Sequence, residues 1–94
     1  MNITGLSAVT LATHNMSDAV RFYCALGFDV ISGAEDSSFT SFRAGSSYLN
    51  LISQPKDKKW DWWGRTIFYV SDVDDFYKNA IAQGIKTDTT PRNA

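Results

Sequence analysis

Residues 8–28 read AVTLATHNMSDAVRFYCALGF, and this stretch decides the fold of the chain. In its first part Val9 and Leu11 alternate with small or polar residues, which is typical of a strand with one buried face. We expect that strand to run from Leu6 to Thr13. From Asn15 onward the apolar residues follow helical spacing, so the stretch predicts a strand that leads directly into an amphipathic helix.

Both ends of this helix carry residues that favour a helix boundary. The side chain of Asn15 can cap the first turn, and the charge of Asp18 favours the helix N-terminus. Gly27 can adopt the left-handed conformation that ends many helices. The apolar positions between them are Met16, Ala19, Val20, Tyr23 and Leu26. We expect Cys24, in the same helix, to be a buried small side chain rather than a nucleophile.

The same pattern returns later in the chain at a constant offset. Asp72 lies 57 residues after Asn15 (72 − 15 = 57), and Gly84 lies the same distance after Gly27. The segment 66–70, TIFYV, precedes Asp72 and predicts a strand. We interpret the chain as two modules, each with a strand, a helix and a glycine stop signal.

Three more strands are expected after the first helix. They span residues 28–32, 38–44 and 48–53. The short turn formed by residues 45–47 predicts that the last two strands pair as a hairpin. The first module therefore has the order βαβββ.

We expect a single domain with three parts. Residues 1–54 form the complete βαβββ module, residues 55–64 form a tryptophan-rich linker, and residues 65–94 form a partial second module. The ten residues that follow Gly84 are enough for one strand and a tail, so the hairpin of the second module is absent.

Composition limits the class of protein. The chain has 94 residues, of which 44% are hydrophobic, so we expect one small globular domain. Nine Lys and Arg against ten Asp and Glu give a net charge of -1, which argues against nucleic acid or an anionic membrane as partner. A single cysteine excludes an intrachain disulfide and a cysteine zinc site. No signal-peptide pattern or membrane span is visible, so we expect a cytoplasmic protein.

Three stretches together resemble the vicinal oxygen chelate superfamily, which includes glyoxalase, bleomycin-resistance and extradiol dioxygenase proteins. They are residues 8–28, residues 46–53 (SSYLNLIS) and residues 64–84 (GRTIFYVSDVDDFYKNAIAQG). The resemblance implies an α+β fold in which paired βαβββ modules form an open, curved sheet. It also implies a cup for small molecules in that sheet, often with a divalent metal.

The metal-ligand positions of the superfamily can be carried onto this chain residue by residue. They fall on Ala8, Asn50 and Arg65, and the fourth position lies beyond Ala94. Alanine has no donor atom, arginine stays protonated, and asparagine is a weak neutral ligand for a hard cation. We therefore expect no metal and no other cofactor. An enzyme of the lyase or dioxygenase type with ligands at other positions is the alternative, and a non-catalytic truncated relative is a further one.

If these positions face inward, period-two alternation defines the lining of the cup. The expected ligand-binding residues are Ala8, Thr10, Phe39, Arg43, Tyr48, Asn50, Trp60, Trp62, Trp63, Arg65, Ile67 and Tyr69. Ala12, Ser41 and Ile52 should lie on the same face. Arg43 and Arg65 could pair with a carboxylate or phosphate of the ligand. The three tryptophans predict either an aromatic flap or dimer contact, or a linker that is pinned onto the sheet.

These features predict a metal-independent protein that binds a small organic molecule, aromatic or anionic, and has no catalytic residue. The absent hairpin should leave a sheet edge exposed, and exposed edges invite pairing with another chain. We therefore expect a homodimer, including a form with exchanged modules. The alternative is that the 94 residues are a fragment of a longer chain.

Overall fold

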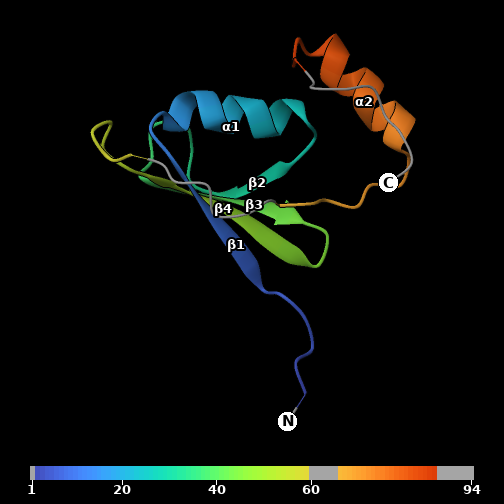
Figure 1. The fold of residues 1–94 in the computed structure, drawn as a ribbon, viewed down its shortest axis with the longest axis horizontal. Helices are drawn as coiled ribbons and strands as arrows, with labels where there is room; N and C mark the ends of the chain where they lie inside the picture. Colours follow the sequence, from blue (N-terminus) through green and yellow to red (C-terminus); the bar gives the residue numbers. More distant parts are fainter. Residues whose placement is uncertain (1, 60–65, 87–94) are drawn as a thin grey trace. The chain divides into compact units, whose positions relative to one another are not determined.

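The computed structural model describes residues 2–59 and 66–86 (Figure 1). It divides into two compact units, residues 1–58 and residues 59–94, and each unit is described by itself. The elements are β1 (Ala8–Thr13), α1 (Met16–Ala25), β2 (Asp29–Ser32), β3 (Phe39–Ala44), β4 (Ser47–Ser53) and α2 (Val73–Ala82). The βαβββ order predicted for the first part of the chain is confirmed, and so is the α+β class.

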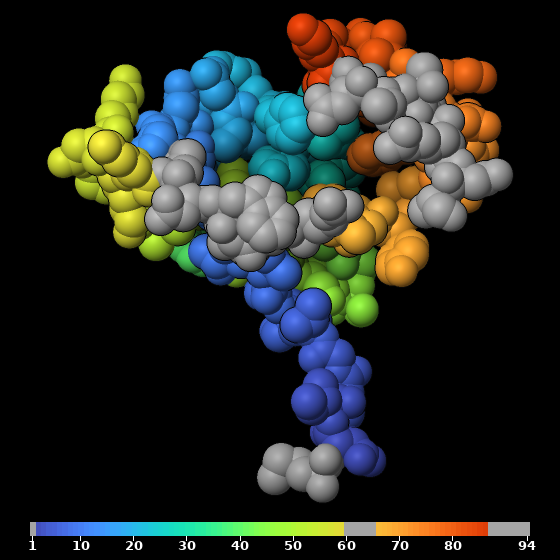
Figure 2. All heavy atoms as spheres, viewed as in Figure 1, coloured from blue at the N-terminus to red at the C-terminus, as the bar shows by residue number. Residues whose placement is uncertain are grey.

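The first unit is a four-stranded sheet with α1 across one face (Figure 1). The strand order is β1-β4-β3-β2, with β1 parallel to β4 and the other neighbours antiparallel. β1 begins at Ala8, later than the Leu6 expected, because pairing with β4 begins there. Residues 2–7 are exposed and extend from the start of β1 (Figure 2).

The core of the first unit lies between α1 and the sheet. Phe42, Leu49 and Leu51 are at most 2% exposed, and they pack against Met16 and Val20 of α1. Burying a side chain of this size stabilises the fold by about 1.5–3 kcal/mol. Because alternate residues of β3 and β4 supply these contacts, the strand periodicity decides which face carries the core.

The two helices share the same capping hydrogen bond at the N-terminus and a glycine at the C-terminus. The Asp18 N–H donates to Asn15 Oδ1 at 3.0 Å, and the Asp75 N–H donates to Asp72 Oδ1 at 3.1 Å. At the other ends Gly27 and Gly84 have φ values of +103° and +81°. The helical part of the predicted repeat, with its caps and glycine stops, is therefore confirmed.

The backbone hydrogen bonds after each helix follow the same rule. The Gly27 N–H donates to the Cys24 carbonyl at 3.0 Å, and the Phe28 N–H donates to the Tyr23 carbonyl at 3.1 Å. Gly84 and Ile85 make the corresponding bonds to Ile81 and Ala80 at 3.0 and 2.9 Å. This pair of bonds is the Schellman motif, which satisfies carbonyls at a helix end.

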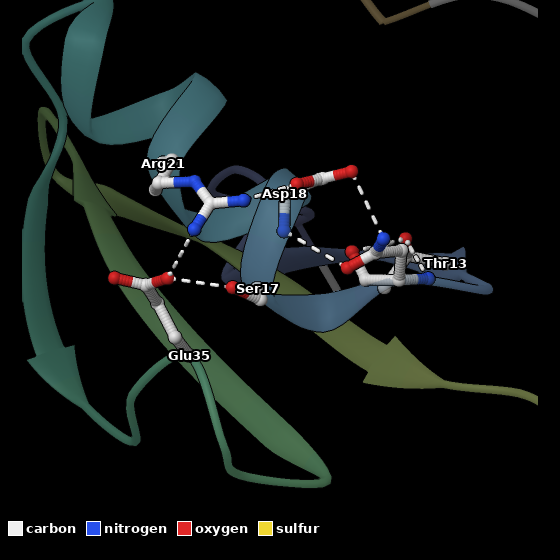
Figure 3. Close-up of polar contacts among 6 residues, drawn as sticks. Thr13, Ser17, Asp18, Arg21 and Glu35 are labelled. Carbon is white, nitrogen blue, oxygen red and sulfur yellow. Dashed lines mark hydrogen bonds and ion pairs between the residues drawn. The ribbon is translucent and has the colours of Figure 1, made fainter.

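Polar side chains join the start of α1 to the loop between β2 and β3 (Figure 3). The Ser17 hydroxyl donates to Glu35 Oε1 at 2.6 Å, and Arg21 Nη1 donates to the same atom at 3.1 Å. Arg21 also pairs with Asp18 in the first turn of the helix. Because all these side chains are exposed, the cluster links the loop to the helix at the surface and contributes little to stability.

Two expectations from the sequence are wrong. Residues 66–70 form no strand in the structure, because β-structure depends on packing and pairing as well as on the local pattern of β-forming residues. Cys24 is exposed rather than buried, because the buried side of α1 is occupied by Met16 and Val20. Neither α1 nor α2, the helices of the described ranges, is long and apolar enough to cross a bilayer.

Candidate functional site

The face of the sheet opposite α1 is the candidate site, and we call it the open face. Alternate residues of β1, β3 and β4 point to it: Ala8, Thr10, Ala12, Phe39, Ser41, Arg43, Tyr48, Asn50 and Ile52. The strand register arranges these side chains in three rows that cross the sheet. The open face therefore carries a polar row between one apolar row and one row that contains the arginine.

The central row is a line of hydrogen-bonding side chains. Thr10, Asn50 and Ser41 are direct cross-strand neighbours. The Ser41 hydroxyl donates to Asn50 Oδ1 at 2.6 Å, and Asn50 Nδ2 lies 3.4 Å from Thr10 Oγ1. The Asn50 amide is therefore oriented from both sides, and it presents fixed polar groups in the middle of the face.

A second row pairs a cation with an aromatic ring. Ala8, Tyr48 and Arg43 are cross-strand neighbours, and the Arg43 guanidinium carbon lies 5.6 Å from the centre of the Tyr48 ring. A guanidinium at this distance is attracted by the ring face, which holds Arg43 over the sheet. Asp29 of β2 is opposite Arg43 in the register, so a carboxylate borders the row.

The third row is apolar and accessible. It contains Ala12, Ile52 and Phe39, and the last two are 36% and 46% exposed. Tyr48 in the arginine row is 37% exposed. Large apolar side chains beside convergent polar groups are typical of surfaces that bind small organic molecules.

The residues of the open face do not fit a catalytic metal. Ala8 offers no donor atom, and Asn50 Oδ1 already accepts the Ser41 hydroxyl. Within residues 2–59 and 66–86 there is no group of three or more His, Cys, Asp or Glu side chains that could hold an ion. His14 follows the last residue of β1, and its Nδ1 lies 3.4 Å from the Gln54 carbonyl oxygen.

The structure brings together only part of the set of site residues predicted from the sequence. Ala8, Thr10, Phe39, Arg43, Tyr48 and Asn50 share the open face. Ile67 and Tyr69 belong to the second unit, where they are 69% and 99% exposed and lie on no strand. The predictions for Trp60, Trp62, Trp63 and Arg65 fall outside the described residues.

The sequence prediction missed two open-face residues of β2, Asp29 opposite Arg43 and Ser32 opposite Ser41. Directly paired residues of two strands lie on the same face, so the β2–β3 register of the structure, rather than the sequence pattern, identifies Asp29 as the neighbour of Arg43. Simple alternation from Asp29 does not extend along β2, because a bulge between Val30 and Ser32 shifts the register of the rest of the strand.

The family model of the glyoxalase/bleomycin resistance protein/dioxygenase superfamily matches residues 5–94. The chain belongs to this superfamily. The family resemblance read from the sequence is therefore confirmed, and the βαβββ unit is the superfamily's module. A search of curated proteins found no match.

Solved structures of other proteins share the superfamily fold. The bleomycin resistance determinant encoded on transposon Tn5 matches with a TM-score of 0.69 at 19% identity, over 94% of this chain and 72% of that one. The protein SMU.1112c matches with a TM-score of 0.66 at 20% identity, over 90% and 78%. A hypothetical protein, SA1046 from S. aureus, matches with a TM-score of 0.56 at 16% identity, over 89% and 72%. At these identities the similarity shows the fold alone.

Proposed function

We propose that this superfamily member is a metal-independent protein that binds a small organic molecule on the open face. The observation that carries this proposal is the central Thr10–Asn50–Ser41 row with accessible apolar side chains on both sides. Polar groups that are held in fixed directions can select a ligand, while apolar neighbours supply most of the contact energy. The donor chemistry of Ala8 and Asn50 supports binding without a metal.

The chemistry of the open face favours a planar ligand with an anionic group. Phe39, Ile52 and Tyr48 offer apolar surface for a flat ring. Arg43, held over Tyr48, can donate two parallel hydrogen bonds to a carboxylate. One solved structure with this fold is a bleomycin resistance determinant, so bleomycin is included among the candidate ligands to be tested.

Binding is tested with 2-naphthoate as the anionic probe, its neutral amide as the uncharged probe, and bleomycin as a third. The full chain is titrated with each probe while backbone amide shifts are followed by NMR in the presence of a chelator. We expect saturable shifts in β3 and β4 around Arg43 and Asn50. Absence of saturation by every probe, or shifts confined to the second unit, would contradict the proposal.

A matched pair of arginine variants tests the role of charge. Arg43→Gln should weaken binding of 2-naphthoate by about tenfold or more, because a charge-assisted hydrogen bond contributes about 1.5–3 kcal/mol. It should leave binding of the neutral amide unchanged. Arg21→Gln, on the helix that covers the other face, is the control and should bind both probes like the parent chain. Equal losses in the two variants would argue against Arg43 as the anion contact.

The enzyme alternative makes the opposite prediction about metal. Incubation with Zn²⁺, Ni²⁺, Mn²⁺ or Fe²⁺, followed by removal of free ion and elemental analysis, should leave less than stoichiometric metal. One bound ion for each chain, together with probe binding that the chelator abolishes, would favour a metal-dependent lyase or dioxygenase. A homodimer and a cytoplasmic location stay predictions from the sequence.

A further inference from the structure

The charged side chains of the open face are neighbours at one end of it. Among the described residues of this face in the first unit, Arg43 and Asp29 are the two with a charged side chain. They are direct partners in the antiparallel pairing of β2 and β3. The side chains of such partners lie on the same face, with Cβ atoms about 4.5–5.5 Å apart. The open face therefore carries a cation next to an anion rather than an isolated cation.

These two side chains do not pair with each other. The Arg43 guanidinium carbon lies 5.6 Å from the centre of the Tyr48 ring, on the side of β3 that faces β4, whereas Asp29 lies on the β2 side. Within the part of the chain that the structure describes, both ion pairs belong to Arg21. Asp29 and Arg43 are exposed, so each can contact a charged group of a ligand.

We propose that the ligand of the open face is an aromatic α-amino acid, and that Asp29 selects it over a plain anion; this inference rests on the proposed function. The Arg43 guanidinium donates hydrogen bonds to the ligand carboxylate. The Asp29 carboxylate accepts hydrogen bonds from the ammonium group on the same ligand carbon. A plain anion is attracted by Arg43 and repelled by Asp29, whereas a zwitterion is attracted by both side chains.

The other rows of the open face fit the side chain of such a ligand. Successive rows are about 7 Å apart, because every second residue of a strand points to the same side. An aromatic ring joined to the zwitterionic group through one methylene can cross the central row toward Phe39 and Ile52, which are 46% and 36% exposed. The Asn50 amide, which accepts the Ser41 hydroxyl, lies between the two ends. The charged group and the ring of the ligand thus contact different rows.

Two probes that differ in one group test the proposal. The amino acid 2-naphthylalanine carries the ammonium group, and 2-naphthylpropionate is the same molecule without it. Each probe is titrated into the full chain at low salt with a chelator present, while backbone amide shifts are followed by NMR. We expect saturable shifts around Asp29, Arg43 and Tyr48 with both probes. The dissociation constant of the amino acid should be about threefold or more below that of the propionate, a factor typical of one exposed ion pair.

A matched pair of aspartate variants tests the selection. Asp29→Asn keeps the size of the side chain and removes its charge. It should weaken binding of the amino acid about threefold and strengthen binding of the propionate by a similar factor, because attraction and repulsion are lost together. A general loss of structure would weaken both, so opposite shifts identify the charge. Asp36→Asn, in the loop at the other end of the β2–β3 hairpin, removes the same charge and should leave both constants unchanged.

The outcomes separate this inference from the proposed function. Opposite shifts in Asp29→Asn that shrink at high salt support selection by Asp29. Saturable binding of both probes with constants that Asp29→Asn leaves unchanged would overturn the inference, and the proposed function would stand. Tighter binding of the propionate than of the amino acid by the parent chain would do the same. Absence of binding by either probe would contradict the proposed function and this inference together.

Discussion

At the scale of single residues, Gly33 is the most crowded of the described glycines of the first unit. Its φ is +87°, a conformation that L side chains rarely adopt. A Cβ atom at Gly33 would lie 2.4 Å from the Phe39 carbonyl oxygen and 2.8 Å from Thr40 Cα, and both are backbone atoms. Thr40 is fully buried, and its hydroxyl donates to the Ala34 carbonyl, so the chain has little freedom to move aside.

Gly33→Ala should therefore lower the free energy of unfolding by about 2–4 kcal/mol, from backbone strain and crowding together. Gly45→Ala is the matched control, because Gly45 has a φ of +63° and no atom within 4 Å of the added Cβ. The control should lose only about 1 kcal/mol. Urea denaturation followed by far-ultraviolet circular dichroism measures the free energy of unfolding of both variants. Equal losses would contradict the prediction, because they would show that the backbone moves away from the added Cβ at Gly33 at no cost.

Tyr23 makes the stability of the first unit depend on pH, because it packs against the core between α1 and the sheet. Its ring packs against Phe28 and Phe42, with ring centres 5.6 and 5.7 Å away, and burial raises the pKa of its hydroxyl. The folded state thus disfavours the charged phenolate more than the unfolded state does. This contribution is fully present below the ordinary tyrosine pKa of about 10 and is lost as pH rises through the higher folded value.

We expect the thermal midpoint of the parent chain to fall as pH rises above about 10. Tyr23→Phe should flatten that fall, whereas Tyr69→Phe should not, because Tyr69 is 99% exposed. Thermal melts of the three chains in a series of alkaline buffers make the comparison. An identical decline in all of them would assign the effect to other groups.

At the scale of elements, the two helices reach the same cap geometry with different side chains. Asn15 caps α1 and also donates from Nδ2 to Asp18 Oδ2 at 2.9 Å. Asp72 caps α2 through Oδ1 alone among the bonds identified at that end. The amide of Asn15 therefore both accepts the capping hydrogen bond and donates one to Asp18. The carboxylate of Asp72 only accepts the capping hydrogen bond.

Exchanging the cap residues separates these functions. Asn15→Asp keeps the acceptor but places a second carboxylate against Asp18, so we expect a loss of about 1 kcal/mol at neutral pH. Asp72→Asn keeps the acceptor and should change stability by only a few tenths of a kcal/mol. Denaturation at neutral and at acidic pH measures both. The loss from Asn15→Asp should shrink in acid, and a loss that is independent of pH would contradict the repulsion.

At the scale of the whole molecule, the first unit contains every strand and the helix of a βαβββ module, but only one face of its sheet is packed against a helix. One face of its sheet is covered by α1, while the opposite face is accessible. The proposed ligand uses the accessible face. The match to residues 5–94 places the second unit in the same superfamily domain as the first.

The sequence by itself determined the features that depend on neighbouring residues. The caps at Asn15 and Asp72 and the stops at Gly27 and Gly84 are set by hydrogen bonds within a few positions of each other. Strand alternation likewise predicted the open face, since side chains on successive residues must point to opposite sides. Only the tertiary structure decided which strands pair. It left residues 66–70 without a strand, exposed Cys24, and set Asp29 beside Arg43, because pairing and burial depend on partners that are distant in the sequence.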